Sequence, residues 1–414
     1  MKRVLVLALL LALSPPAPVG SFRGPLQEGG LRPGSFVDRT QQVWPFDRST
    51  PSTARRLFAL AQEKTIHTFN PAEIEVLMNP DVDIVYHTLA HFPIPGDPSN
   101  LYDQVYLNHI RQAKKDLEVA STKLDQEAVE LGRVYREHRR LRFLNLALFM
   151  ADDLSSFKQA LSSIDYYRVE SEVPDNSSGP ESAAQARKRP EILIFQNARR
   201  LIPLFSNRFP EEVERKFVRD FAEAMEDEQI QFYRSYRESR SELDQQDFDR
   251  FQRMWRGQGY AVVRPWAARS GVNVFKIYLS PVFRNNGRGV PVNQAQSVLF
   301  YVVAPLPETD EHARQSLFVV LHETSHRVTD SVLEEASGSA EVAGELRENA
   351  VFFANHLYLK NRFPDLHTAY LRFFLNAPAS TPARAAELER MFLKTYPVPP
   401  PLQEALRRTV KNLS

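Results

Sequence analysis

The sequence contains one group of residues whose types and spacing suit metal chemistry, the motif HETSH at residues 322–326, which has the form HExxH. In a helix, residues four positions apart differ by about 40° around the axis and by about 6 Å along it, so His322 and His326 can reach one tetrahedral ion. Glu323 points in another direction, and its carboxylate can accept a proton from metal-bound water without binding the ion. A structural histidine pair on an ordinary helix face is the alternative interpretation.

The residues around the motif predict a buried helix. After Pro305 and Pro307, either Thr309 or Asp310 is suited to be the N-cap of a helix that continues through the motif. The four residues before the motif, 318–321, are Phe, Val, Val and Leu. Such an apolar run is expected to bury the site, which excludes competing water and stiffens metal ligands.

This region resembles the zincin metallopeptidases, in which HExxH lies on a helix after a small sheet and binds catalytic zinc. The resemblance covers about 60 residues, Ser297 to Leu357. The pattern HExxHxxGxxH of the metzincin branch is not matched, because Thr329 and Val332 stand where that pattern has glycine and histidine. The region is similar instead to the gluzincin branch, whose third ligand is a glutamate on a later helix, often 18 or more residues beyond the second histidine.

The resemblance implies that His322, His326 and Glu345 hold zinc, one ion per chain, and that Glu323 is the catalytic base. Glu345 is separated from His326 by 18 residues, which agrees with the gluzincin spacing. A helical hairpin with a turn near residues 334–339 would bring the two side chains level. The expected reaction is hydrolysis of a peptide or protein substrate by activated water.

Glu348 and Glu341 compete with Glu345 for the third ligand position. Their helix is expected to run from Ala340 to Lys360, and an apolar seam predicts its buried face. This seam places Glu348 and Glu341 about opposite the buried face and Glu345 somewhat nearer to it. The seam consists of Ala343, Leu346, Ala350, Phe353 and Leu357.

Other parts of the substrate site are less well defined by the sequence. His356 and Tyr358 lie too far along the helix from Glu345 to join it around one ion, whereas His367, after a proline break, stays open as an oxyanion donor. An edge strand at Ser297–Val303 is a candidate for pairing with an extended peptide.

The remaining sequence predicts an α+β fold that is mostly helical. Residues 52–256 read as a helical region with a polar loop at 172–190, and residues 257–414 read as the zincin-like catalytic domain. That domain is expected to hold a small, largely antiparallel sheet, then the HExxH helix and further helices. Expected strands are Tyr260–Val263, Val272–Leu279 and Ser297–Val303, and expected short helices in the N-terminal half include Ser52–Lys64 and Pro71–Met78.

The first 20 residues have the form of a secretory signal peptide. Lys2 and Arg3 precede ten apolar residues, 4–13, and a small, proline-rich segment follows. Ten residues are too short to span a bilayer about 30 Å thick, and no later apolar stretch is long enough, so no stable membrane insertion is expected. Residues 21–51 read as an irregular arm, and the mature protein is expected to be periplasmic or extracellular.

Composition excludes several classes of function. The 52 lysines and arginines balance 51 acidic residues, which gives no electrostatic case for nucleic acid. The chain has no cysteine, so disulfide scaffolds, thiolate metal sites and cysteine nucleophiles are excluded.

Two further interpretations stay open. His87 and His91 repeat the four-residue histidine spacing without the glutamate, which favours a structural pair over a second metal site or a wall of the substrate cleft. For the whole chain, the alternative to a peptidase is a noncatalytic envelope or secreted binding protein with a structural or vestigial metal site.

Overall fold

The computed structural model describes residues 74–92, 104–165, 196–284, 286–294, 297–337, 344–377 and 384–413. All of them belong to the unit Ser35–Ser414. The expected signal peptide, the irregular arm, the helix Ser52–Lys64 and the polar loop 172–190 lie outside the described residues. The described residues form many helices and one small mixed sheet, which confirms the mostly helical α+β class.

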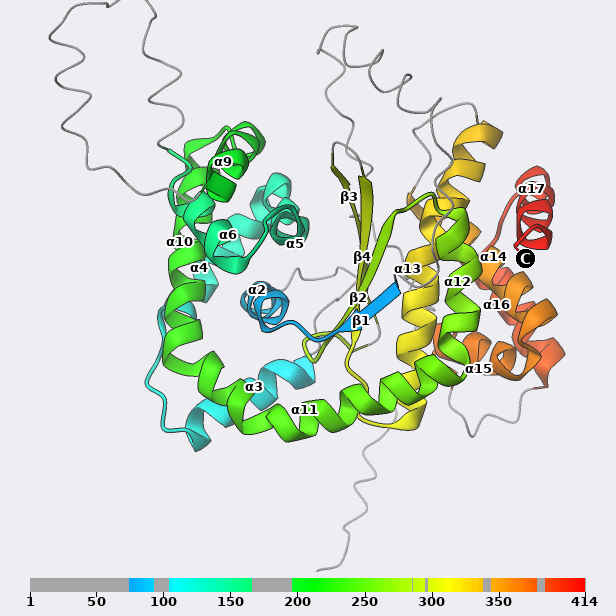
Figure 1. Ribbon diagram of the computed structural model, residues 1–414, viewed down its shortest axis with the longest axis horizontal. Helices are drawn as coiled ribbons and strands as arrows, with labels where there is room; N and C mark the ends of the chain where they lie inside the picture. Colours follow the sequence, from blue (N-terminus) through cyan, green and yellow to red (C-terminus); the bar gives the residue numbers. More distant parts are fainter. Residues whose placement is uncertain are drawn as a thin grey trace, which may run out of the picture. The chain divides into compact units, whose positions relative to one another are not determined.

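The sheet has four strands in the order β1-β2-β4-β3 (Figure 1). Their bounds are β1, Ile74–Leu77; β2, Val274–Ser280; β3, Arg288–Gln294; and β4, Ser297–Pro305. β2 pairs in parallel with both β1 and β4, and only the β3–β4 pair is antiparallel. The expectation of a largely antiparallel sheet is therefore wrong.

The sheet is mostly parallel because its strands do not pair in chain order. β3 and β4 form a hairpin, but it is β4 and not β3 that pairs with β2. β1 comes from the stretch Pro71–Met78, for which a short helix was expected. The expected strand Tyr260–Val263 is instead the beginning of helix α12, Tyr260–Arg269.

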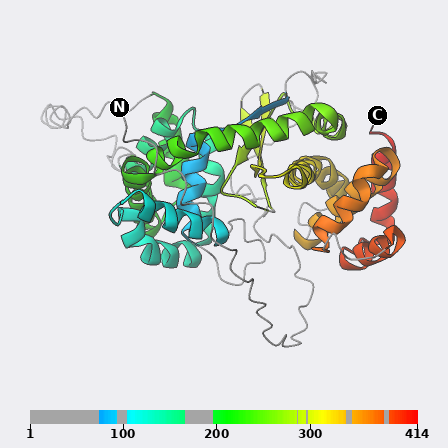
Figure 2. The same cartoon turned by 90° about the horizontal axis from the view of Figure 1, so that it is seen from below.

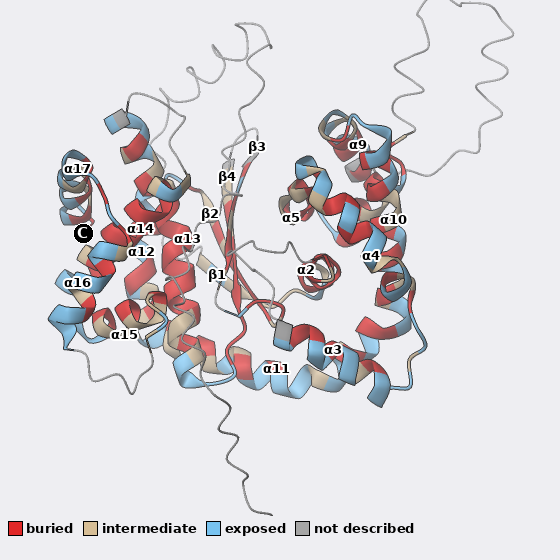
Figure 3. Ribbon diagram, turned by 180° about the vertical axis from the view of Figure 1, so that it is seen from behind, coloured by how far each residue is buried: buried red, intermediate tan, exposed pale blue. Residues whose placement is uncertain are grey.

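Both faces of the sheet are covered by apolar cores. Phe275, Ile277 and Leu279 of β2 pack with the C-terminal helices, whereas Tyr278 packs with the N-terminal helices. Burial on both sides explains why β4 is an almost continuous apolar run. Up to Leu279, β2 is apolar except for Lys276, whose Nζ lies 3.2 Å from Oε2 of Glu75 on β1. Figure 3 shows the buried strands between helices.

The N-terminal layer is built from short helices that pack around α10. Their bounds are α2, Pro80–Ala90; α3, Gln104–Asp116; α4, Lys123–Glu137; α5, Leu144–Ala147; α6, Leu154–Ser162; α9, Gln196–Arg208; and α10, Glu212–Glu228. Short 3₁₀ segments flank α5, at Arg139–Phe143 and Leu148–Met150. α10 contacts α2, α4 and α6.

A continuous helical stretch leads from α10 to α12, which packs on the other face of the sheet with the C-terminal helices. π-helical turns at Gln229–Tyr233 and Trp255–Gly259 connect α10 to α11, Arg234–Met254, and α11 to α12. The expected domain boundary at residue 257 falls inside this run. Both α11 and α12 contact the helix that carries the HExxH motif.

That helix is α13, Asp310–Ser337. It begins where the Thr309 side-chain oxygen accepts a hydrogen bond from the backbone N–H of His312 at 3.1 Å, which confirms Thr309 as a cap. α13 contacts β3 and β4 as well as α14. The following helices are α14, Gly344–Arg362; α15, Pro364–Phe374; α16, Ala385–Thr395; and α17, Pro400–Lys411 (Figure 2). Each helix in the described ranges is too short or too polar to span a bilayer.

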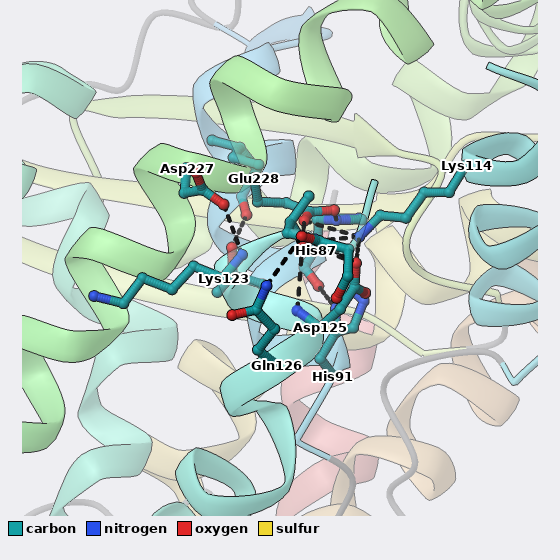
Figure 4. A network of polar contacts seen from close by, with 12 residues as sticks. His87, His91, Lys114, Lys123, Asp125, Gln126, Asp227 and Glu228 are labelled. Atoms are coloured by element: carbon teal, nitrogen blue, oxygen red, sulfur yellow. Dashed lines mark hydrogen bonds and ion pairs between the residues drawn. The ribbon is translucent and has the colours of Figure 1, made fainter. Parts of the chain in front are cut away.

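A buried polar network joins four helices of the N-terminal layer (Figure 4). The Glu228 carboxylate at the end of α10 is fully buried, and its Oε1 accepts a hydrogen bond from Nε2 of His87 at 2.9 Å. Its Oε2 accepts from Nζ of Lys114 at 2.9 Å and from the hydroxyl of Thr122. Because α2, α3, α4 and α10 each supply a group, the network fixes their mutual packing.

The same network accounts for the pair His87 and His91. Nδ1 of His87 accepts a hydrogen bond from the Tyr106 hydroxyl at 2.8 Å, so both ring nitrogens of His87 have protein partners. Nδ1 of His91 donates to the backbone carbonyl of His87 at 2.9 Å. These contacts favour a structural role for the pair.

Replacement of Glu228 by Gln should lower the free energy of unfolding at pH 7 by about 1.5–3 kcal/mol, the range for hydrogen bonds to charged groups. Lys114 would keep only one carboxylate partner, that of Asp125, whose Oδ2 lies 2.7 Å from its Nζ. Burial alone would raise the pKa of Glu228, but His87, Lys114 and Thr122 outweigh it and lower the pKa from 4.5 to about 2. The stabilisation by the wild-type carboxylate is therefore complete above pH 4.5 and is lost as the pH falls through about 2. The difference between wild type and variant should narrow over this range.

Urea unfolding followed by circular dichroism at several pH values measures this difference. Glu223→Gln is the matched control, because Glu223 lies on the same helix and pairs with Lys123 at the surface. It should change stability by no more than about 1 kcal/mol. A difference between wild type and Glu228→Gln that stays constant down to pH 2 would contradict the prediction.

Candidate metal centre

The HExxH motif lies in the middle of α13, on a part of the helix that is buried from all sides. Phe318, Val320 and Leu321 just before it are almost completely buried in the core shared by the sheet and the C-terminal helices. Both motif histidines and Glu323 are buried as well. The expected burial of the motif is therefore what the structure shows.

Three side chains bring metal-binding atoms together at this point. Nε2 of His322 lies 3.2 Å from Nε2 of His326, as expected for histidines four residues apart on one helix. From α14, the Glu348 carboxylate places Oε2 at 2.9 Å from Nε2 of His322 and Oε1 at 3.5 Å from Nε2 of His326. His322, His326 and Glu348 form a fully buried group of potential metal ligands.

The separations within this group fit a tetrahedral ion. Two nitrogen ligands at about 2.0–2.1 Å from such an ion lie about 3.3 Å apart, close to the distance between the two Nε2 atoms. Two imidazole nitrogens and a carboxylate are also a donor set that zinc prefers. The residues present therefore fit the metal that the sequence analysis expects.

The electrostatics of the group favour a bound cation. Burial alone would raise the pKa of Glu348, but His326 and His322 outweigh it and hold that pKa well below its usual range. Burial alone would lower the pKa of His326, but Glu348 and Asp330 raise it well above the usual value. The buried carboxylate thus demands positive charge between the rings, which a metal ion or a proton can supply.

The carboxylate beside the two histidines is that of Glu348 and not that of Glu345, the residue expected from the sequence. Glu345 is exposed in the first turn of α14, one turn before Glu348. Glu341 lies outside the described residues. The structure therefore brings the alternative candidate, Glu348, to the two histidines.

Two features of α13 and α14 explain the difference. α14 contacts α13, α15 and α17, so its residues from Arg347 to His356 are all buried and a single apolar seam does not identify the side that faces α13. In addition, α13 continues to Ser337 and so includes residues that were expected to form the turn at 334–339. Because α13 is longer than expected, the residue of α14 that lies beside His326 is also one turn further from the connection between the two helices.

Glu323 is held by the backbone of the edge strand β3. Its Oε2 accepts a hydrogen bond from the backbone N–H of Gly289 at 2.8 Å. Burial raises the pKa of the Glu323 carboxyl, and Glu348 adds to this, whereas His322 and His326 act against it. One oxygen is thus oriented by the backbone, and a raised pKa suits a group that must take up a proton.

Gly289 was not recognised as a site residue in the sequence. A Cβ atom at this position would lie 2.8 Å from Cζ of Phe300 and 3.2 Å from Oε2 of Glu323, so only glycine allows the strand this close to α13. Gly287, two residues earlier, would place a Cβ against Val319 and the carbonyl of Val303. Two glycines beside a strand are a signal for such a close backbone approach.

The other residues considered for the substrate site are engaged elsewhere. Nδ1 of His356 lies 2.8 Å from Nε2 of His367, and the Tyr358 hydroxyl donates to the carbonyl of Val262 at 3.0 Å.

The strand expected to bind an extended peptide is not at an edge of the sheet. β4, which contains Ser297–Val303, lies between β2 and β3. Its hydrogen bonds are therefore already used on both sides, and β3 is the edge strand on the side of Glu323.

A second group with metal-binding atoms exists among the described residues, His138, Glu211 and Glu214. Nη1 of Arg140 lies 2.9 Å from Oε1 of Glu211 and 3.8 Å from Oε1 of Glu214, so an arginine already supplies positive charge to this group. Glu211 and Glu214 also form a capping box at the beginning of α10. These contacts are those of a structural helix terminus.

A scan of protein-family models gives no match to this chain, and searches of curated proteins and of solved structures give none either.

Replacement of Glu348 by Ala should weaken zinc binding by more than about 100-fold, because a direct ligand contributes more than the outer partners, whose loss typically costs 10–100-fold. Glu345→Ala is the matched control, since it removes an exposed carboxylate from the same helix, and it should bind zinc as wild type does. Competition with a chromogenic chelator measures the affinities. Loss of zinc in Glu345→Ala with retention in Glu348→Ala would restore the original prediction and contradict the geometry described above.

Proposed function

We propose that the protein is a zinc-dependent peptidase that hydrolyses peptide bonds, with one zinc ion per chain held by His322, His326 and Glu348. The single observation that carries this proposal is a buried group of two imidazole nitrogens and a carboxylate, next to a second buried carboxylate, Glu323, on the same helix turn. A site that only holds a structural metal has no need for Glu323.

A zinc ion in such a site supplies Lewis acidity and makes a water nucleophilic at neutral pH. The chain's own residues then handle the proton. Glu323 has Oε2 fixed by the N–H of Gly289, and its carboxylate accepts the proton of the attacking water and returns a proton to the leaving amine.

His322 on α13 and Glu348 on α14 would bind the zinc ion from opposite helices. The contact of 2.9 Å between them keeps the ligand atoms of α13 and α14 together, so the two helices hold the donors in place before a metal arrives. Preorganised ligands lose little entropy on binding, which favours tight retention of the ion.

We also propose that the protein is exported and acts in the periplasm or outside the cell, on peptide or protein substrates. This proposal rests on the N-terminal sequence, in which Lys2 and Arg3 precede a run of ten apolar residues.

The alternative is a noncatalytic envelope or secreted binding protein in which the same residues hold a structural metal. The two candidates differ in the role of Glu323, since only the peptidase requires its carboxylate. Replacement of this residue therefore distinguishes them.

Glu323→Gln should lower kcat for peptide cleavage by about 10²–10⁴-fold, because an amide cannot act as the general base. The variant should still bind one zinc per chain, since Glu323 is not among the proposed ligands. Cleavage of a peptide library and metal analysis of both purified proteins measure these effects. Unchanged cleavage in the variant would remove the proposed base, and zinc-free wild type after expression in zinc-replete medium would remove the mechanism.

Gly289→Ala should lower kcat by about 10–100-fold, because the new methyl group pushes β3 away from α13 and misplaces the Glu323 carboxylate. Zinc affinity should stay the same. Gly257→Ala is the control, because a Cβ atom at that position has no neighbour within 4 Å and should leave activity unchanged. A kcat of Gly289→Ala equal to that of wild type would show that the backbone contact does not orient the base.

A further inference from the structure

The two ring nitrogens of His326 are in different situations. Nε2 faces the ligand group, at 3.2 Å from Nε2 of His322 and 3.5 Å from Oε1 of Glu348. Nδ1 lies on the other side of the ring, where it is buried and has no hydrogen-bond partner among the described residues. When Nε2 of a neutral imidazole binds a metal, Nδ1 carries the hydrogen and requires an acceptor.

An acceptor lies one helix turn further along α13. Oδ1 of Asp330 is 3.9 Å from Nδ1 of His326, and it too is buried without a hydrogen-bond partner among the described residues. The distance is too long for a hydrogen bond, but a movement of about 1 Å brings it into the normal range. A donor and an acceptor that both lack partners thus face each other across this gap.

Asp330 is held in place from the second ligand helix. Its other oxygen, Oδ2, lies 3.2 Å from Nη1 of Arg347, the residue directly before Glu348 on α14. The Arg347 side chain is only 3% exposed and that of Asp330 is 24% exposed, so solvent screens this ion pair weakly. The ion pair joins the same two helices that supply the metal ligands.

We propose that Asp330 is a positioning residue that orients His326 through a hydrogen bond from Nδ1, and that Arg347 fixes Asp330 for this purpose. The proposal rests on the proposed function, because it assigns Nε2 of His326 to a metal. A metal bound at Nε2 would fix the orientation of the His326 ring, and Asp330 would accept the hydrogen of Nδ1 in that orientation. Two neighbouring residues of α14 then fix the position of His326. Glu348 lies beside its Nε2, and Arg347 holds Asp330 beside its Nδ1.

This arrangement explains why a charged arginine is buried beside the site. A buried guanidinium is costly unless it is paired, and Arg347 has Asp330 at 3.2 Å and Glu334 at 3.7 Å. Of these two carboxylates, only Asp330 is close to His326. Glu334, with 46% of its side chain exposed, lies one turn further along α13.

The test compares zinc affinities of purified full-length variants by competition with a chromogenic chelator. Asp330→Ala should bind zinc about 10–100-fold more weakly than wild type, the range typical for loss of a carboxylate that orients a metal-binding histidine. Asp330→Asn keeps the side-chain shape and an acceptor oxygen, so its loss should be smaller, about 3–10-fold. At saturating zinc, Asp330→Ala should lower kcat and leave KM unchanged, which a purely structural residue would not do.

Glu334→Gln is the matched control, because it removes a negative charge near the same arginine without any contact to His326. It should bind zinc as wild type does. Urea unfolding of the metal-free proteins shows whether each variant folds, and Asp330→Asn carries the test if Asp330→Ala does not. Zinc affinities of Asp330→Ala and Asp330→Asn equal to that of wild type, or an equal loss in Glu334→Gln, would overturn the proposal.

The outcome separates this proposal from the proposed function. Wild type that binds zinc and loses cleavage in Glu323→Gln, together with Asp330 variants of wild-type zinc affinity, would overturn the role of Asp330 alone. Wild type that binds no zinc would overturn both.

Discussion

A carboxylate buried between two imidazole rings is the interaction on which this structure depends. Transfer of a charged group such as Glu348 into the interior costs several kcal/mol unless positive charge lies beside it. The rings of His322 and His326 provide nitrogen atoms and not a fixed charge, so the group is complete only with a cation or a proton. Because the carboxylate comes from α14 and the rings from α13, this requirement also fixes how the two helices pair.

The sequence predicted the parts of the site that are local in the chain. HExxH, its cap at Thr309 and the apolar run before it lie within one helix, and helical periodicity relates them directly. The carboxylate beside the histidines could not be predicted in the same way, because it depends on where α13 ends and on how α14 packs. α14 is buried all around from Arg347 to His356, so its sequence does not show which side faces α13. Glu348 and Glu345 differ by one turn, and only the packing of α14 distinguishes them.

The same limit applies to the fold. The mostly helical α+β class followed from composition and periodicity, and β2 and β4 were located within a few residues. Their pairing was not predictable, because β1 comes from the other end of the described chain. In addition, β4 lies between β2 and β3, which are consecutive strands in the sequence. Tyr260–Val263, which has strand-forming residues, is helical since it continues the long run that begins with α10.

The strand that orients Glu323 does so with a main-chain group. Every residue type except proline carries an N–H, so the chemical identity of this donor is insensitive to sequence drift at position 289. The size of the residue is constrained, because the gap between β3 and α13 leaves no room for a side chain. A substitution at position 289 would therefore move the Glu323 carboxylate through the volume of the new side chain and not through its polarity.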